Sequence, residues 1–184
     1  MDDDLDRRIK RLYAAVGEIE RQDLTAFPPQ VVKSGSVTAW FQDFTGGLSE
    51  PQLENLAILA VQSVAHLRDP LRRWARQNGK NPQDVDAAIK QSDPLRLVLD
   101  LAEHAKHGGQ RRDGGYSGKS PHLGPVERSF RLVAPPRSRV ELQFGPQGVI
   151  PTPNAKGSRV VLSAPILDQD GQKVGDLDRR CAQR

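Results

Sequence analysis

Histidines and aspartates are spaced in two places so that they could do chemistry together. Asp100, His104 and His107 follow one another at steps of four and three residues, which puts all three on one side of a helix. His66 and Asp69 lie three residues apart in an earlier segment. A carboxylate that orients an imidazole makes it a general acid–base, and two imidazoles with carboxylates can also bind zinc. The candidate catalytic set is therefore His107, His66, Asp69 and Asp100.

On a helical wheel, these side chains lie outside the apolar faces of their predicted helices. At about 100° per residue, Asp100, His104 and His107 point away from the leucine and alanine arc of their segment. His66 and Asp69 lie opposite the apolar stripe of the earlier helix. On straight helices both sets would face solvent or a partner, and they would not need to face each other. A break at Asp69 would relax this objection. A solvated helix face, a catalytic site and a metal site all stay open as interpretations.

A glycine-rich run is similar to a phosphate-binding loop but does not match one. Residues 114–120 read Gly-Gly-Tyr-Ser-Gly-Lys-Ser. The phosphate loop needs a glycine separated by four intervening residues from Gly-Lys-Ser, and Asp113 stands at that position instead. Pro121 follows almost at once, where that motif requires a helix. A flexible Gly/Ser-rich basic linker over residues 108–125 explains the composition better. The single cysteine, Cys181, has no nearby histidine and is not expected to be a nucleophile.

Basic side chains concentrate where this linker joins the two halves of the chain. Residues 106–139 hold eight lysines or arginines against Asp113 and Glu127, in a chain of net charge +4. Such charge neutralises phosphates without requiring a specific geometry. Tyr116 is the only aromatic residue of the linker, which leaves little capacity for base stacking. The expected contacts with RNA or another polyanion are Lys106, Arg111, Arg112, Lys119 and Arg131.

The elements that must position these residues follow from the apolar periodicity. Steps of three and four residues predict helices over residues 5–23, 49–79, 82–90 and 93–107. Ser49 begins the second with a capping box. Pro70 should kink or break that helix, and a break would make Asp69 an N-cap. Residues 30–48 are expected to be irregular. Three aromatic residues there are the expected core anchors: Trp40, Phe41 and Phe44.

Beyond residue 125 the period changes to two, which predicts strands. They are expected near residues 130–134, 140–144, 160–162 and 166–167, with a turn at residues 168–171. The fold class is therefore α+β, an N-terminal helical bundle followed by a small antiparallel β-rich region in one unit. Three segments are expected: a helical bundle (1–107), the linker (108–125) and the β-rich region (126–184), which could end in a helix over residues 176–184.

The composition and the first residues indicate the cellular compartment in which we expect the protein. One cysteine excludes an internal disulfide, which suits a reducing environment. The acidic start Met1–Asp4 is not typical of a secretory signal, and no apolar run is long enough to span a membrane. We expect a cytoplasmic protein without membrane contact. No cofactor motif is intact, so no cofactor and no metal site is assigned.

Part of the helical half resembles a known family. Residues 66–71 (His-Leu-Arg-Asp-Pro-Leu) and the later run 95–107, which ends Asp-Leu-Ala-Glu-His-Ala-Lys-His, look like uncharacterised bacterial proteins. Their helical bundles carry a His-x-x-Asp element and then an Asp-…-Lys-His element before a β-rich tail. Such bundles are similar to the HEPN superfamily, which supplies ribonucleases and regulatory modules to toxin–antitoxin and phage-defence systems. The resemblance covers about residues 50–107.

One departure limits what the resemblance implies. HEPN ribonucleases carry an arginine and a histidine with four to six residues between them, whereas seven separate Arg96 from His104. The resemblance thus implies the bundle more than the nuclease. If the chemistry carried over, it would imply His107 as the base, His66 as its partner and Lys106 or Arg96 as a phosphate contact.

The function expected from the sequence is that of an accessory or interaction module. Its partners would be nucleic acid, another protein or a second copy of the chain. The two alternatives are a HEPN-like, metal-independent ribonuclease and a metal-dependent hydrolase.

Overall fold

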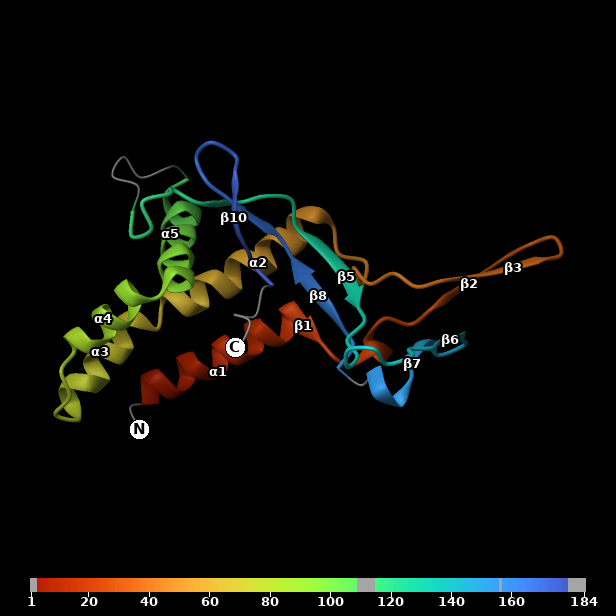
Figure 1. Ribbon diagram of the computed structural model, residues 1–184, viewed down its shortest axis with the longest axis horizontal. Coiled ribbons are helices and arrows are strands. Elements are labelled where there is room, and N and C mark those ends of the chain that lie inside the picture. Colours follow the sequence, from red (N-terminus) through yellow and green to blue (C-terminus); the bar gives the residue numbers. More distant parts are fainter. Residues whose placement is uncertain (1–2, 109–114, 156, 179–184) are drawn as a thin grey trace.

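Helices fill the first part of the chain and short antiparallel strands most of the rest, which confirms the predicted α+β class (Figure 1). The computed structural model describes residues 3–108, 115–155 and 157–178. In this part of the chain α1 and α2 pack side by side, and α5 packs on α2. The helices are α1 (Asp3–Ile19), α2 (Glu50–Ala65), α3 (Arg68–Gln77), α4 (Gln83–Gln91) and α5 (Asp93–His107). Two 3₁₀ helices, η1 (Leu24–Ala26) and η2 (Pro153–Ala155), lie in the connections.

Several helix ends form where the sequence places their signals. The Gln52 side chain accepts the backbone N–H of Ser49 at 2.8 Å, which is the reciprocal half of a capping box. Ser92 begins α5, and its hydroxyl accepts the N–H of Leu95. Gly108 ends α5 with a φ of 66°, in the left-handed region that glycine adopts without steric cost. These contacts fix α5 at the length expected from the sequence.

The long helix expected over residues 49–79 is broken at His66 and Leu67. Pro70 has no N–H to donate to the carbonyl group of His66, and its ring crowds that turn. The chain therefore ends α2 at His66 and starts α3 with Leu67 as N-cap, so Asp69 lies in the first turn and is not the N-cap. Of the two alternatives, a kink or a break, the structure shows the break, and the N-cap expected at Asp69 was wrong.

The main sheet brings the strand that follows α1 next to two strands from the second half of the chain. Its central strand, β8 (Arg159–Ser163), pairs antiparallel with β5 (Glu127–Arg131) and with β1 (Glu20–Arg21). Strand β1 forms where the first helix was expected to continue to Asp23, so that helix ends earlier than predicted. A second sheet contains β10 (Lys173–Asp176), β9 (Pro165–Leu167) and β4 (His122–Leu123). The predicted turn between β9 and β10 is present.

Hydrophobic clusters join the helices to these sheets. One contains Ala15 of α1, Ala57 of α2 and Leu162 of β8, whose side chains are buried. A second joins Leu101 of α5 to Ile166 of β9. Both clusters therefore combine helical residues with β-rich residues. None of the described helices is long and apolar enough to cross a membrane.

Two hairpins extend away from these clusters (Figure 1). The first, β2 (Gln30–Ser34) and β3 (Val37–Phe41), occupies a segment that was expected to be irregular. Trp40 and Phe41, expected as core anchors, are 46% and 57% exposed, so that prediction was wrong. Phe44 does pack, with its ring 5.5 Å from that of Phe130. The second hairpin consists of β6 (Leu142–Gly145) and β7 (Gly148–Pro151).

The end of the chain differs in part from expectation. Strand β10 runs to Asp176, where the sequence suggested the start of a helix over residues 176–184. Residues 179–184, with Cys181, lie outside the described residues.

Candidate functional site

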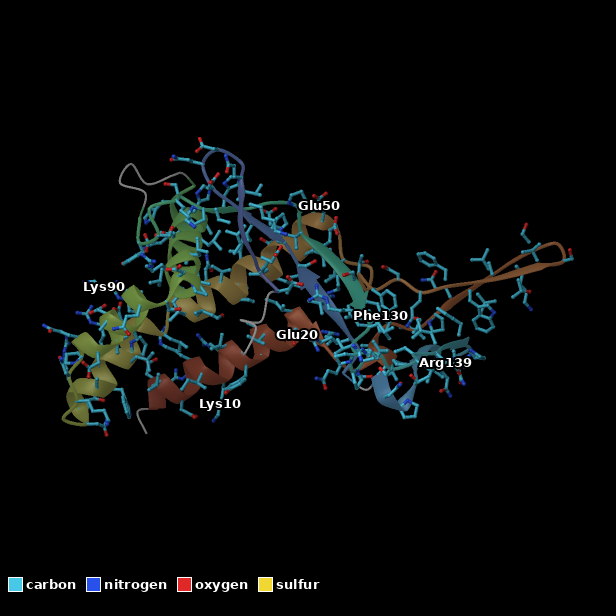
Figure 2. All side chains as sticks on the ribbon, viewed as in Figure 1. Lys10, Glu20, Glu50, Lys90, Phe130 and Arg139 are labelled. Atoms are coloured by element: carbon cyan, nitrogen blue, oxygen red, sulfur yellow. The ribbon has the colours of Figure 1, made fainter. Side chains whose placement is uncertain are left out.

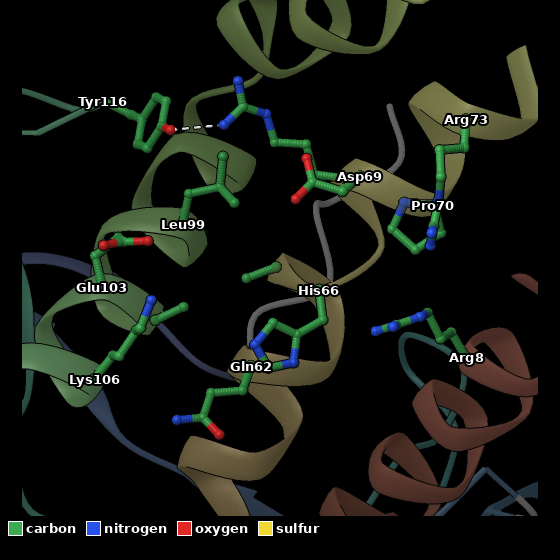
Figure 3. A pocket seen from close by; sticks show the side chains of 13 residues that line it. Arg8, Gln62, His66, Asp69, Pro70, Arg73, Leu99, Glu103, Lys106 and Tyr116 are labelled. Carbon is green, nitrogen blue, oxygen red and sulfur yellow. Dashed lines mark hydrogen bonds between the residues drawn. The ribbon is translucent and has the colours of Figure 1, made fainter. Parts of the chain in front are cut away.

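Helices α1, α2, α3 and α5 surround a cavity of about 690 Å³ (Figure 3). Its polar wall is assembled from separate elements: Arg8 on α1, His66 at the end of α2, Arg73 on α3, and Glu103 and Lys106 on α5. The arrangement brings charged side chains that are distant in sequence to one place. The other lining residues are Gln62, Ala65, Arg68, Asp69, Pro70, Leu99, Ala102 and Tyr116.

The break between α2 and α3 is what turns His66 and Asp69 toward this cavity. Both side chains stay accessible to solvent, as the helical wheel predicts. They nevertheless line a hollow that α5 also lines, which two straight helices would not require. The helix break therefore converts a polar stripe into one wall of a site.

Cationic side chains dominate the charged lining. Four cations line the cavity, Arg8, Arg68, Arg73 and Lys106, whereas only two carboxylates do, those of Asp69 and Glu103.

Asp4 holds two of the arginines in place. Its carboxylate lies 3.2 Å from Nε of Arg8 and 2.6 Å from Nη2 of Arg73. A guanidinium group has five N–H donors, so pairing with one carboxylate leaves donors for a second anion.

Arg68 connects α4 and the loop that carries Tyr116 to the cavity wall. Its Nε and Nη2 donate to Oδ1 of Asp86 at 3.0 and 2.8 Å, and its Nη1 donates to the hydroxyl of Tyr116 at 2.8 Å. The guanidinium carbon also lies 5.6 Å from the centre of the tyrosine ring. The hydrogen bond from Arg68 holds the pKa of Asp86 below its ordinary value, and the same bond raises the pKa of Arg68.

Asp100 anchors the loop that carries Tyr116. Although the helical wheel indicated a solvent-facing position, this side chain is only 4% exposed, so that expectation was wrong. Its carboxylate accepts the backbone N–H groups of Tyr116 and Ser117, each at 2.7 Å. Gly115 has a φ of 68°, and a Cβ atom there would lie 2.2 Å from Oδ1 of Asp100. The geometry makes Asp100 a positioning residue for the loop.

This anchoring differs from the flexible linker expected over residues 108–125. Within the described part of that segment, Ser120 and Pro121 are buried and β4 pairs with β9. The glycine-rich run is thus followed by a strand, whereas a phosphate-binding loop is followed by a helix.

The other candidate histidines lie outside the cavity wall. His107 is 60% exposed, and its Nε2 lies 3.3 Å from a carboxylate oxygen of Glu103. His104 stacks at 6.1 Å on His122 of β4, and its Nδ1 is buried without a hydrogen-bond partner among the described residues. His66 is the only one of these histidines that lines the cavity.

The predicted nucleic-acid contacts are not gathered in one place. Lys106 lines the cavity, whereas Lys119 lies on the anchored loop and Arg131 on β5 pairs with Asp178. Arg111 and Arg112 lie outside the described residues.

Sequence reasoning missed five charged or aromatic residues of the cavity wall: Arg8, Arg68, Arg73, Glu103 and Tyr116. The spacing of His66 and Arg73 on one polar stripe gave a signal for Arg73. Nothing in the sequence connects Arg8 with α5.

A second hollow of about 530 Å³ adjoins the cavity along α1 and α2. Arg8, Gln62 and His66 line both hollows, so the two form one elongated depression. The second hollow adds the apolar surface of Ala15 and Leu59. Its remaining lining residues are Arg11, Ala14, Glu18 and Ser63.

In the part of the chain that the structure describes, no three histidine, cysteine, aspartate or glutamate side chains come together in a way that could hold a metal ion. The metal-dependent hydrolase considered from the sequence has no candidate site among those residues.

Comparisons of the chain with models of protein families, with curated proteins and with solved structures find no match.

Proposed function

We propose that this protein is an RNA-binding module, and that the cavity between α1, α2, α3 and α5 holds the phosphate groups of a single strand. One observation carries the proposal: four cationic side chains and an imidazole converge on one cavity from separate helices. Lysine and arginine neutralise phosphates, and the counterions that this releases favour binding.

The ion pairs around the cavity indicate two roles for the cations: among the described residues, the arginines are held in place by carboxylates, and Lys106 is not. Arg8 and Arg73 share Asp4, and Arg68 is held by Asp86. These pairs keep the guanidinium groups in fixed positions and leave them further N–H donors. Lys106 forms no ion pair with another described residue, so its full charge is available to a phosphate.

The shape of the depression favours a strand over a single small anion. The two hollows of about 690 and 530 Å³ share part of their lining, and each lies in the range of a drug-sized ligand site. Tyr116 lies at the edge of the first hollow and offers a face on which a base can stack. The apolar surface beside Leu59 suits another base.

Salt dependence provides the test. We would measure the affinity for a fluorescently labelled, single-stranded RNA oligonucleotide by anisotropy over a range of salt concentrations. For single strands the slope of log K against log salt is about −0.7 per neutralised phosphate. Three or four contacts would give a slope of roughly −2 to −3, and Lys106→Gln should make it less steep by about 0.7.

Lys33→Gln is the matched control, because it removes the same charge from the β2–β3 hairpin, at the opposite end of the molecule (Figure 1). Its slope should equal that of the wild type. A flat salt dependence, or equal affinities for the wild type and Lys106→Gln, would defeat the proposal.

A second candidate function, RNA cleavage without a metal, is favoured by the place of His66 among the cations. In this reaction the imidazole takes the proton of a 2′-hydroxyl group, and that oxygen attacks the adjacent phosphorus. The 5′-oxygen leaves with a proton from a general acid, so the products are a 2′,3′-cyclic phosphate and a 5′-hydroxyl end. The cations would stabilise the charge on the phosphoryl oxygens.

The two histidine assignments make different predictions for this reaction. If His66 is the base, His66→Ala should abolish cleavage and retain binding, while His107→Ala should cleave normally. The HEPN resemblance instead makes His107 the base. Cleavage that persists in His66→Ala and is lost in His107→Ala would exclude the assignment to His66. A wild type that cleaves no RNA would leave binding as the proposed function.

A further inference from the structure

The hairpin of β2 and β3 extends from the body of the protein without packing against it. All ten of its strand residues are exposed. Figure 2 shows their side chains standing away from the body, at the end opposite α3 and α4. An isolated two-stranded hairpin is marginally stable in water. An extended arm of this kind is therefore stabilised when another surface covers it.

Both faces of the hairpin carry apolar residues. Val32, Val37 and Phe41 lie on one face. Val32 pairs with Ala39, and Val37 and Phe41 are each two residues from Ala39, so their side chains point to the same side. Val31 lies opposite Trp40 on the other face. Among the described residues thirteen large hydrophobic side chains are exposed, and eight of them lie on the two hairpins. They are Val31, Val32, Val37, Trp40, Phe41, Leu142, Phe144 and Ile150.

Gln42, at the base of the first hairpin, connects it to the second beside the turn between β6 and β7. Its side-chain amide donates to the carbonyl group of Phe27 at 2.6 Å, and its oxygen accepts the N–H of Val149 at 2.9 Å. The arms are therefore held by the same residue, which lies directly after β3. Each hairpin also has unpaired outer edges among the described strands, because each forms a sheet of two strands only.

The composition of these arms favours an uncharged, apolar surface as their cover. Residues 30–41 contain one charged side chain, Lys33, and residues 142–151 contain none. A partner that binds through opposite charges would need charged residues on the arms. A second copy of the same chain would bring an equally uncharged, apolar surface without like-charge repulsion, and its free strand edges could pair with these.

The exposed apolar area of the two hairpins approaches the area that a standard interface takes from each partner. An aromatic side chain buries about 150–250 Å², so the exposed fractions of Trp40, Phe41 and Phe144 together leave roughly 350 Å² uncovered. The five aliphatic residues add a comparable area. A stable interface of standard size takes about 800 Å² from each partner.

We propose that the protein forms a homodimer in which the two hairpins of one copy cover those of the other, with the β2–β3 arms paired along a free strand edge. The contact is isologous, with the same residues on both sides of a two-fold axis. The arms lie at the far end of the molecule from the cavity, so the dimer presents two open cavities. This inference does not depend on what the cavity binds.

Sedimentation velocity on the full chain tests the proposal. The wild type should sediment as a dimer at tens of micromolar. Replacing Val32 and Phe41 by lysine places two charges on one face of each arm and should give a monomer. Tyr13→Lys is the control, because Tyr13 is 74% exposed on α1 and should leave the dimer unchanged. A monomeric wild type, or a double variant that remains dimeric, would overturn the proposal.

Tryptophan emission supplies a second measurement that does not depend on the lysine variants. The chain has two tryptophans, so Trp74→Phe leaves Trp40 as the only reporter. Dilution should shift its emission to longer wavelength as the arms separate and water reaches the ring. Emission that is independent of concentration across the range of the sedimentation experiment would count against arm-to-arm association.

Discussion

Replacing Asp100 by asparagine tests whether one buried carboxylate holds the Tyr116 loop against α5. The carboxylate accepts two backbone N–H groups, those of Tyr116 and Ser117, at 2.7 Å each. Asparagine has the same shape but only one oxygen, so its NH₂ group must face one of the two amides. One hydrogen bond then loses its charge, and the other is replaced by two donors facing each other in a site that is 4% exposed.

The size of the effect follows from these two changes. A hydrogen bond to a charged group contributes about 1.5–3 kcal/mol, and a buried donor without a partner costs about 1–3 kcal/mol. Because the loop can relax, we expect Asp100→Asn to lower the free energy of unfolding by about 2–4 kcal/mol. For a chain of this length, that corresponds to a fall in Tm of about 5–15 °C.

Thermal and urea unfolding followed by circular dichroism would measure this change. Asp93→Asn is the matched control on the same helix, because the Asp93 side chain is 80% exposed and pairs with Arg96 at the surface. A surface ion pair of this kind contributes about 0–1 kcal/mol. Equal melting temperatures for Asp100→Asn and Asp93→Asn would refute the assignment of Asp100 as the anchor of the loop.

Three other substitutions test separate parts of the structure. Gly115→Ala should lower the free energy of unfolding by at least about 1–2 kcal/mol, since its φ is positive and the added methyl group would meet Asp100; urea unfolding measures it. The pKa of Asp86 is lowered by Arg68, so the stability that this pair contributes is complete above pH 3.8 and is lost as the pH falls through the lower folded-state value. Asp86→Asn should therefore weaken the acid dependence of Tm, and an unchanged acid profile would contradict this. Leu162→Ala removes a fully buried side chain and should cost about 2–5 kcal/mol, measured by urea unfolding; a loss below about 1 kcal/mol would contradict its central place in the core.

The sequence predicts best where the signal is local. The residues that begin and end α5 are adjacent to the helix, so Ser92 and Gly108 can be recognised without knowing the fold. The same holds for the break before Pro70, because the missing N–H is a property of proline itself. The β2–β3 hairpin also had a local signal, two apolar runs separated by Gly35-Ser36. We expected its aromatic residues to fill a core, and that assumption concealed the hairpin.

The candidate site was less predictable because its walls come from distant segments. Asp100 lies away from the apolar arc of α5, yet it is buried because the chain returns over that face at residues 115–121. A helical wheel describes one helix and contains no information on what later packs against it. Arg8 and Lys106 meet across a cavity that exists only once α1 and α5 have both packed on α2.

Strand β1 gives the folding of the chain a temporal order. Glu20 pairs with Val161 and Arg21 pairs with Val160, which are separated by about 140 residues of intervening chain. During synthesis α1 and α2 can associate early, but the face of Ile19 that packs with Leu162 stays uncovered until the ribosome has released β8. Newly made chains thus expose this apolar face for most of translation, and shortened chains that stop before residue 159 should depend on chaperones to stay in solution.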